Sequence, residues 1–163
     1  AFDNCLHAVN ACDLFLGIIT PTYGSGKDKD GLSITHRELQ RAIEIGKPRW
    51  LLAHNQVVFA RRLLRDIGRD TSEKRSRLHL KKGAKSISDL RVIDMYEEAI
   101  RNTEPLAERP GNWVQEFHAD EDALLFAAAQ FSRFQEVERF IQENLANPAQ
   151  VMAKIPPRQG TDK

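Results

Sequence analysis

The chain of 163 residues has little of several features that would assign it to a special class. It has two cysteines, Cys5 and Cys12, in a segment with helical periodicity; two helical turns separate such positions by roughly 10 Å, too far for a disulfide. The sequence has no CxxC motif and no His/Cys cluster, so it predicts no metal site. Its longest apolar run, around LFLGII, has the length of a strand, not the ~20 residues needed to span a bilayer.

Strong net charge and targeting signals are also missing. The net charge of +1 argues against a chain built mainly to bind nucleic acid or an anionic membrane. The N-terminus shows no basic segment followed by a long apolar one, as a secretory signal would. A hydrophobic share of 41% and a charged share of 29% are ordinary for a globular domain. We therefore expect a soluble cytoplasmic protein with no membrane association, and nucleic acid is not the expected partner.

Three motifs of nucleotide binding and nucleophilic catalysis are absent: GxxxxGK[ST], GxGxxG and GxSxG. Their absence excludes P-loop, dinucleotide-fold and α/β-hydrolase interpretations.

What the sequence does have is an alternation of helix and strand patterns. Apolar runs over 12–20 and 48–54 are typical of strands covered on both faces, and 111–117 alternates like a further strand. Short connections between strands and helices predict βαβ units and a parallel sheet. Five helices are expected. One begins near Phe2, and the others lie at 33–46, around 60–67, at 88–102 and, as a long C-terminal helix, at about 120–146.

The expected organisation is one domain over 1–150 followed by a flexible tail, 151–163. Within the domain, residues 61–85 hold ten lysines or arginines, three acidic residues and no phenylalanine, tryptophan or tyrosine. Without rings to stack bases, this segment is poorly suited to bind RNA or single strands. We interpret it as a basic, solvated connection over about 68–87, with phosphate binding as the alternative.

A candidate site lies at the carboxyl end of the first strand, because ligands of doubly wound α/β folds bind outside that edge of the sheet. The N-terminus of the following helix suits a phosphate group, Gly24 permits close backbone approach, and Tyr23 can stack on a base. Seven residues fall at this edge: Thr20, Tyr23, Gly24 and Ser25 after the strand, and Ser33, Thr35 and His36 at the helix start.

Glu38 has two incompatible interpretations. With Thr35 as N-cap, Thr35-His-Arg-Glu38 forms a capping box and Glu38 is structural. With Ser33 as N-cap, Glu38 lies further into the helix, where it can face a cleft and stabilise positive charge at an anomeric carbon. His36 is similarly open, either an exposed histidine at a helix start or a catalytic base.

The order of these features resembles a known family. The segments ACDLFLGIITPTYGSG and GLSITHRELQRAIEIGKPRWLLAH resemble prokaryotic TIR-like (Toll/interleukin-1 receptor-like) domains of unknown function, which often precede signalling NTPases. Residues 12–20, 23–25, 33–38 and 42–54 carry the match. The same order is distantly similar to nucleoside deoxyribosyltransferases.

The resemblance implies a flavodoxin-like three-layer sandwich, with a mostly parallel sheet and the long C-terminal helix. It also implies that Glu38 acts on an N-glycosidic bond, with NAD or a related nucleotide as substrate and no resident cofactor. That family begins with a strand and a helix that are missing ahead of residue 1 here.

The leading hypothesis is therefore a TIR-like nucleotide-binding domain that cleaves the N-glycosidic bond of NAD or a relative in prokaryotic signalling or defence. The alternative is a non-catalytic interaction module that assembles a signalling protein through sheet edges and the C-terminal helix. The partners that these hypotheses imply are a nucleotide ligand, a second copy of the chain, and a fused or associated signalling NTPase.

Overall fold

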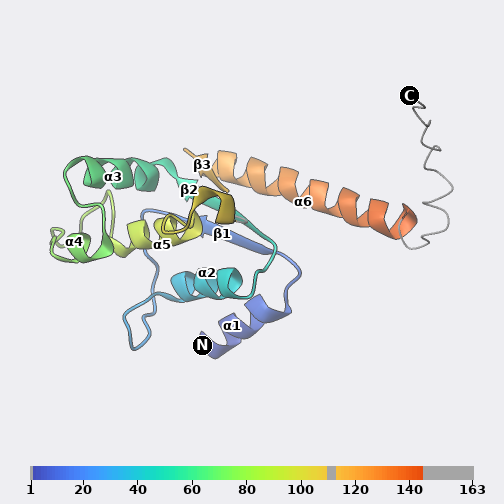
Figure 1. Ribbon diagram of the computed structural model, residues 1–163, viewed down its shortest axis with the longest axis horizontal. Coiled ribbons are helices and arrows are strands. Elements are labelled where there is room, and N and C mark those ends of the chain that lie inside the picture. The colour runs from blue at the N-terminus through green and yellow to red at the C-terminus, as the bar shows by residue number, and fades with distance from the viewer. Residues whose placement is uncertain (1, 110–112, 145–163) are drawn as a thin grey trace, which may run out of the picture. The chain divides into compact units, whose positions relative to one another are not determined.

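The computed structural model describes residues 2–109 and 113–144, so the tail predicted at 151–163 lies outside the described residues. Strands and helices alternate through the first half of the chain, as Figure 1 shows. The strands are β1 (Phe15–Ile19), β2 (Arg49–His54) and β3 (Val114–Phe117). The helices are α1 (Phe2–Ala11), α2 (Ile34–Glu44), α3 (Asn55–Asp66), α4 (Ser72–Ser76), α5 (Arg91–Ala99), the 3-10 helix η1 (Leu106–Glu108) and α6 (Asp120–Asn144).

The three strands form a parallel sheet in the order β1-β2-β3. Phe15 pairs with Arg49 across β1 and β2, and Leu51 pairs with Val114 across β2 and β3. Parallel neighbours need a crossover connection, which α2 supplies between β1 and β2. The predicted α/β class, its flavodoxin-like layout with a parallel sheet, and the long C-terminal helix are confirmed.

The core lies where α2, α3 and α5 contact the sheet and one another. Each of these helices places one apolar face inward, which is the pattern that its sequence spacing predicts. Among the largest buried side chains are Ile19, Leu39, Leu51, Val57 and Ile93.

Gly46 ends α2, as its position before Pro48 predicts. It has a φ of 63°, in the left-handed region where a glycine avoids the cost of a Cβ. Its N–H donates to the carbonyl of Ile43, and the Lys47 N–H donates to the carbonyl of Ala42. This pair of bonds is a Schellman motif, which satisfies carbonyls that the helix end leaves open.

The basic segment after α3 contains a helix, α4, that its composition did not predict. Thr71 is the N-cap of α4, and its side chain accepts a hydrogen bond from the Lys74 N–H. Arg75 in this helix is 2% exposed, which is unusual for a residue in a highly charged stretch. The segment therefore contributes to the packed interior as well as to the surface.

The chain divides into two compact units, Ala1–Ala123 and Leu124–Lys163. The first unit contains the sheet and helices α1 to α5, and most of α6 belongs to the second. Of the helices in the described ranges, none combines the length and apolar character required to cross a bilayer.

Candidate functional site

Ser33 sets the register of α2. Its backbone is extended, with φ −70° and ψ 159°, and its hydroxyl accepts a hydrogen bond of 3.2 Å from the His36 N–H. Ser33 is therefore the N-cap, and the capping box of Thr35 with Glu38 is wrong. A short antiparallel bridge between Lys27 and Ser33 keeps the chain extended up to the cap, and the helix already includes Ile34 and Thr35, so Thr35 is not the N-cap.

A small hollow of about 230 Å³ opens at the carboxyl end of β1, and we refer to it as the rim cavity. Four predicted site residues lie around it: Thr20, Tyr23, Gly24 and Thr35. Its other walls come from the end of β1, from Thr22 and from two apolar residues of α5. The edge of the sheet predicted from the sequence therefore does hold a concave site, and half of the eight predicted residues line it.

The loop around the rim cavity is held by its own hydrogen bonds. The Thr20 hydroxyl donates to the Thr22 carbonyl at 3.1 Å and accepts from the Thr22 N–H at 3.3 Å. The Tyr23 N–H donates to the Ser88 hydroxyl, and the Ser88 N–H donates to the Pro21 carbonyl. Gly24 turns the chain at a φ of 92°, which residues with a Cβ rarely adopt.

The remaining predicted residues are placed differently. Ser25 is exposed, and Ser33 is fully buried as the N-cap. Glu38 lines neither cavity described here, and its side chain makes no hydrogen bond or ion pair with another described residue. It lies three residues after Thr35, so the two share one side of α2.

His36 is 1% exposed, so the interpretation as an exposed histidine at a helix start is wrong. Its Nδ1 lies 2.7 Å from the Tyr23 hydroxyl, and the two rings meet edge to face at 5.7 Å between centroids. Its Nε2 lies 3.2 Å from Oε1 of Glu98. Tyr23, His36 and Glu98 thus form a chain of polar contacts that begins at the rim cavity and ends on α5.

The pKa values along this chain move in opposite directions. Burial raises the pKa of the Tyr23 hydroxyl above its usual range. Burial also acts to raise the pKa of Glu98, but the close approach of the His36 ring, the hydrogen bond from the Gln40 amide and the nearby Arg37 outweigh it, and the net pKa is lowered. The Gln40 side-chain amide donates to Oε2 of Glu98 at 3.0 Å. Glu98 is therefore ionised at neutral pH, and Tyr23 is protonated.

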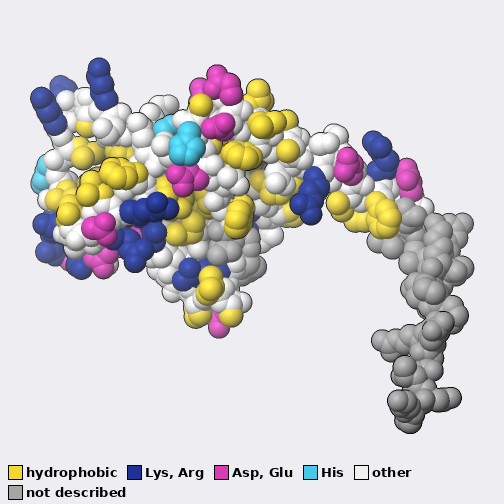
Figure 2. Space-filling view, turned by 90° about the horizontal axis from the view of Figure 1, so that it is seen from above, with side chains coloured by type: hydrophobic (Ala, Val, Ile, Leu, Met, Phe, Trp, Pro, Cys, Tyr) yellow, Lys and Arg dark blue, Asp and Glu magenta, His cyan; other side chains and the backbone are white. Residues whose placement is uncertain are grey.

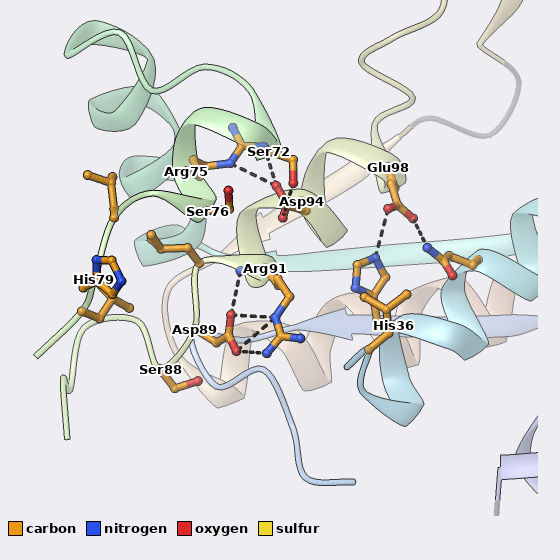
Figure 3. Close-up of a pocket in the computed structure, with 15 residues that line it drawn as sticks. His36, Ser72, Arg75, Ser76, His79, Ser88, Asp89, Arg91, Asp94 and Glu98 are labelled. Atoms are coloured by element: carbon orange, nitrogen blue, oxygen red, sulfur yellow. Dashed lines mark hydrogen bonds and ion pairs between the residues drawn. The ribbon is translucent and has the colours of Figure 1, made fainter. Parts of the chain in front are cut away.

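A larger cavity of about 570 Å³ lies between α2, α4 and α5, and we refer to it as the α4–α5 cavity. Figure 3 shows its labelled polar side chains: Arg75, Ser72, Ser76 and Asp94 along one side, Asp89 and Arg91 along another, with His36 and Glu98 at one end and His79 at the other. Its volume falls within the ~300–1,000 Å³ of small-molecule sites.

Arg91 connects the two cavities. Its guanidinium binds the Asp89 carboxylate with two nitrogens, donates to the carbonyl of Gly31, and lies 4.9 Å from the centroid of the Tyr23 ring. The hydrogen bonds from Arg91 lower the pKa of Asp89 from 3.8 to about 2. Asp89, Arg91 and Glu98 were missed in the sequence, because no short motif contains them.

The described residues contain no group of side chains suited to bind a metal ion. Across 2–109 and 113–144, no three histidine, cysteine, aspartate or glutamate side chains are grouped to hold a metal ion. Cys5 and Cys12 are free thiols.

The model of a family described as "Domain of unknown function (DUF4062)" matches residues 1–109. The chain belongs to this family. The DUF4062 match contains both cavities and all eight predicted site residues, and it ends before β3 and α6. Neither a curated protein nor a solved structure matches the chain. DUF4062 membership brings no activity with it, and the relationships to TIR-like domains and to nucleoside deoxyribosyltransferases remain predictions.

Proposed function

We propose that this DUF4062 chain contains a TIR-like nucleotide-binding domain that acts in prokaryotic signalling or defence. The observation that carries the proposal is the convergence of Thr20, Tyr23, Gly24 and Thr35 on one hollow at the carboxyl end of β1. Ligands of open α/β sheets bind at this edge.

The chemistry of the rim cavity suits a sugar or a base. The side chains of Thr20, Thr22 and Thr35 supply hydroxyl groups, and Tyr23, which is 3% exposed, borders the hollow from the core and leaves no ring face open for the stacking expected from the sequence. Its volume of about 230 Å³ is smaller than that of sites for whole drug-sized ligands, so it accommodates one ring of a nucleotide. The phosphate groups then extend towards the N-terminus of α2, whose dipole favours negative charge.

Cleavage of the N-glycosidic bond of NAD or a related nucleotide is the second step of the proposal, with Glu38 as the key carboxylate. The Ser33 register supports it, because Glu38 is not used as a cap and shares a side of α2 with Thr35. A carboxylate on that side can stabilise the positive charge that develops at the anomeric carbon as the base leaves. Glu38 must then approach a ligand that extends beyond the rim cavity.

The test incubates the protein with NAD and a panel of nucleosides and nucleotides and follows base release by chromatography. Glu38→Gln removes the charge and keeps the size of the side chain; Glu44→Gln, on the same helix with a side chain 69% exposed, is the matched control. We expect release by the wild type and the control only. Equal release by all three proteins would refute the role of Glu38. Binding without release, lost in Thr35→Val, would support the nucleotide site alone.

A second candidate is a non-catalytic assembly module, which one surface favours. Phe59, Leu63 and Ile67 recur every four residues along α3 and its end and are 65%, 48% and 60% exposed. Figure 2, viewed from the side on which α3 lies, shows a band of hydrophobic side chains at the left beside lysine and arginine. An exposed apolar stripe of this kind is typical of an interface.

We assign this stripe to a second copy of the chain, because a two-fold axis can place it against itself. Light scattering on the wild type and on Phe59→Ser with Leu63→Ser tests this. We expect a dimer that the double substitution dissociates, and no change from Leu106→Ser, which alters another exposed leucine. A wild-type monomer at high concentration would contradict the assignment.

A further inference from the structure

The α4–α5 cavity is separate from the rim cavity and has no role in the proposed function. Three carboxylates line it, from Asp89, Asp94 and Glu98, against the two guanidinium groups of Arg75 and Arg91. In a partly enclosed space this excess of negative charge is screened less than on an open surface. The cavity therefore favours a cation over an anion.

Both guanidinium groups are already paired within the protein. Arg75 binds Asp94 and Glu97 at 2.6 Å each, and Arg91 binds Asp89. An anionic ligand would have to compete with these carboxylates for the same donors. The positive side chains of the cavity are therefore poor anchors for a phosphate or a carboxylate.

Glu98 is the exception among the carboxylates. Among the described residues it forms no ion pair with a lysine or an arginine, and its contacts are the Gln40 amide and the His36 ring. Its side chain is 40% exposed, and its lowered pKa keeps it ionised at neutral pH. Nε2 of His36, although 3.2 Å from Glu98, has no well-directed hydrogen bond in this part of the chain. The end of the cavity at Glu98 thus holds a carboxylate that no lysine or arginine of the described residues pairs with.

The rest of the cavity offers an apolar surface. Four leucines line it: Leu32, Leu78, Leu80 and Leu90. Leu80 is 41% exposed, so a hydrocarbon that covers it gains burial that the empty cavity does not provide. An ionised carboxylate at one end and leucine side chains along the walls together define an amphipathic ligand.

We propose that the α4–α5 cavity binds an organic amine: its ammonium group donates to the Glu98 carboxylate, and its apolar body lies against the leucines. A charge-assisted hydrogen bond of this kind is about twice as strong as a neutral one. It also brings Glu98 a permanent cation, which no lysine or arginine among the described residues supplies.

The experiment compares three probes of one size by titration calorimetry on the whole chain at pH 7 and low salt: 3-phenylpropylammonium, 3-phenylpropanol and 3-phenylpropanoate. We expect the ammonium to bind at least tenfold more tightly than the alcohol, and the carboxylate to bind more weakly than the alcohol. Tighter binding of the carboxylate than of the ammonium, or no measurable binding of the ammonium, overturns the proposal.

Substitutions then locate the site. Glu98→Gln keeps the size of the side chain and is expected to weaken ammonium binding at least tenfold and remove the preference over the alcohol; Glu44→Gln outside this cavity leaves both unchanged. Leu80→Ala is expected to lower the affinity for all three probes and to keep the order of their affinities. If Glu98→Gln does not fold, Leu80→Ala alone tests the location of the site. Wild-type affinity in both Glu98→Gln and Leu80→Ala refutes the assignment.

Discussion

Arg75→Ala tests how strongly the buried ion pair between α4 and α5 stabilises the fold. Arg75 is 2% exposed and donates from Nε and Nη2 to Asp94, at 3.0 and 2.6 Å, and from Nη2 to Glu97 at 2.6 Å. Removing one partner of such a pair costs about 3–5 kcal/mol, because the remaining charge stays buried without compensation.

The remaining contacts of the two carboxylates place the cost near the lower limit of this range. After the substitution, Glu97 keeps an ion pair with Arg61 at 3.1 Å, and Asp94 keeps the hydroxyl of Ser72 at 3.0 Å. We therefore expect a loss of about 3 kcal/mol in the free energy of unfolding. In a chain of this size, that loss lowers the melting temperature by roughly 6–12 °C.

Arg77→Ala is the matched control. Arg77 belongs to the same segment and pairs with Glu73, but these side chains are 68% and 76% exposed, and surface pairs contribute about 0–1 kcal/mol. Urea unfolding followed by circular dichroism measures both variants. Equal losses in the two variants, or a loss below about 1 kcal/mol in Arg75→Ala, would refute the reasoning.

Three further predictions concern the site. Ser33→Ala should cost about 1 kcal/mol through the lost N-cap, and Glu38→Ala much less; urea titrations that reverse this order would restore the capping box. Tyr23→Phe leaves the buried His36 ring without its hydroxyl partner and should cost about 1–3 kcal/mol; a loss below about 0.5 kcal/mol in thermal unfolding contradicts this. Because the folded state lowers the pKa of Asp89 from 3.8 to about 2, its contribution to stability is present above pH 4 and declines as the pH falls towards 2. Asp89→Asn should flatten that part of the stability curve, and an unchanged slope would count against the ion pair.

The sequence could predict the features that depend on neighbours in the chain. The apolar runs that form β1 and β2 and the turn at Gly24 are local patterns, so the rim cavity was located from the rule for strand ends. The residue at which α2 begins could not be predicted from local patterns, because Ser33 and Thr35 are both good N-caps. The folded chain decides between them, because the His36 N–H donates to the Ser33 hydroxyl and Thr35 is already helical.

Features that join distant segments could not be predicted in this way. His36 meets a carboxylate 62 residues later in the chain, at Glu98, and neither residue lies in a motif that names the other. Arg75 belongs to a stretch whose composition indicates a solvated surface, yet Asp94 and Glu97 neutralise it from another helix. Composition reports how many charges a segment has, but not which of them find a buried partner.

Tyr23 and His36 join the two cavities by a direct contact, and this contact has a thermodynamic consequence. Tyr23 lines the rim cavity, and its hydroxyl contacts His36, which lines the α4–α5 cavity. A ligand that moves the ring or takes its hydrogen bond changes the environment of the other cavity by the same contact. Linkage then requires reciprocity: the factor by which a nucleotide alters the affinity for an amine equals the factor by which the amine alters the affinity for the nucleotide. Two ligands that do not contact each other would thus be coupled in affinity through the contact between Tyr23 and His36.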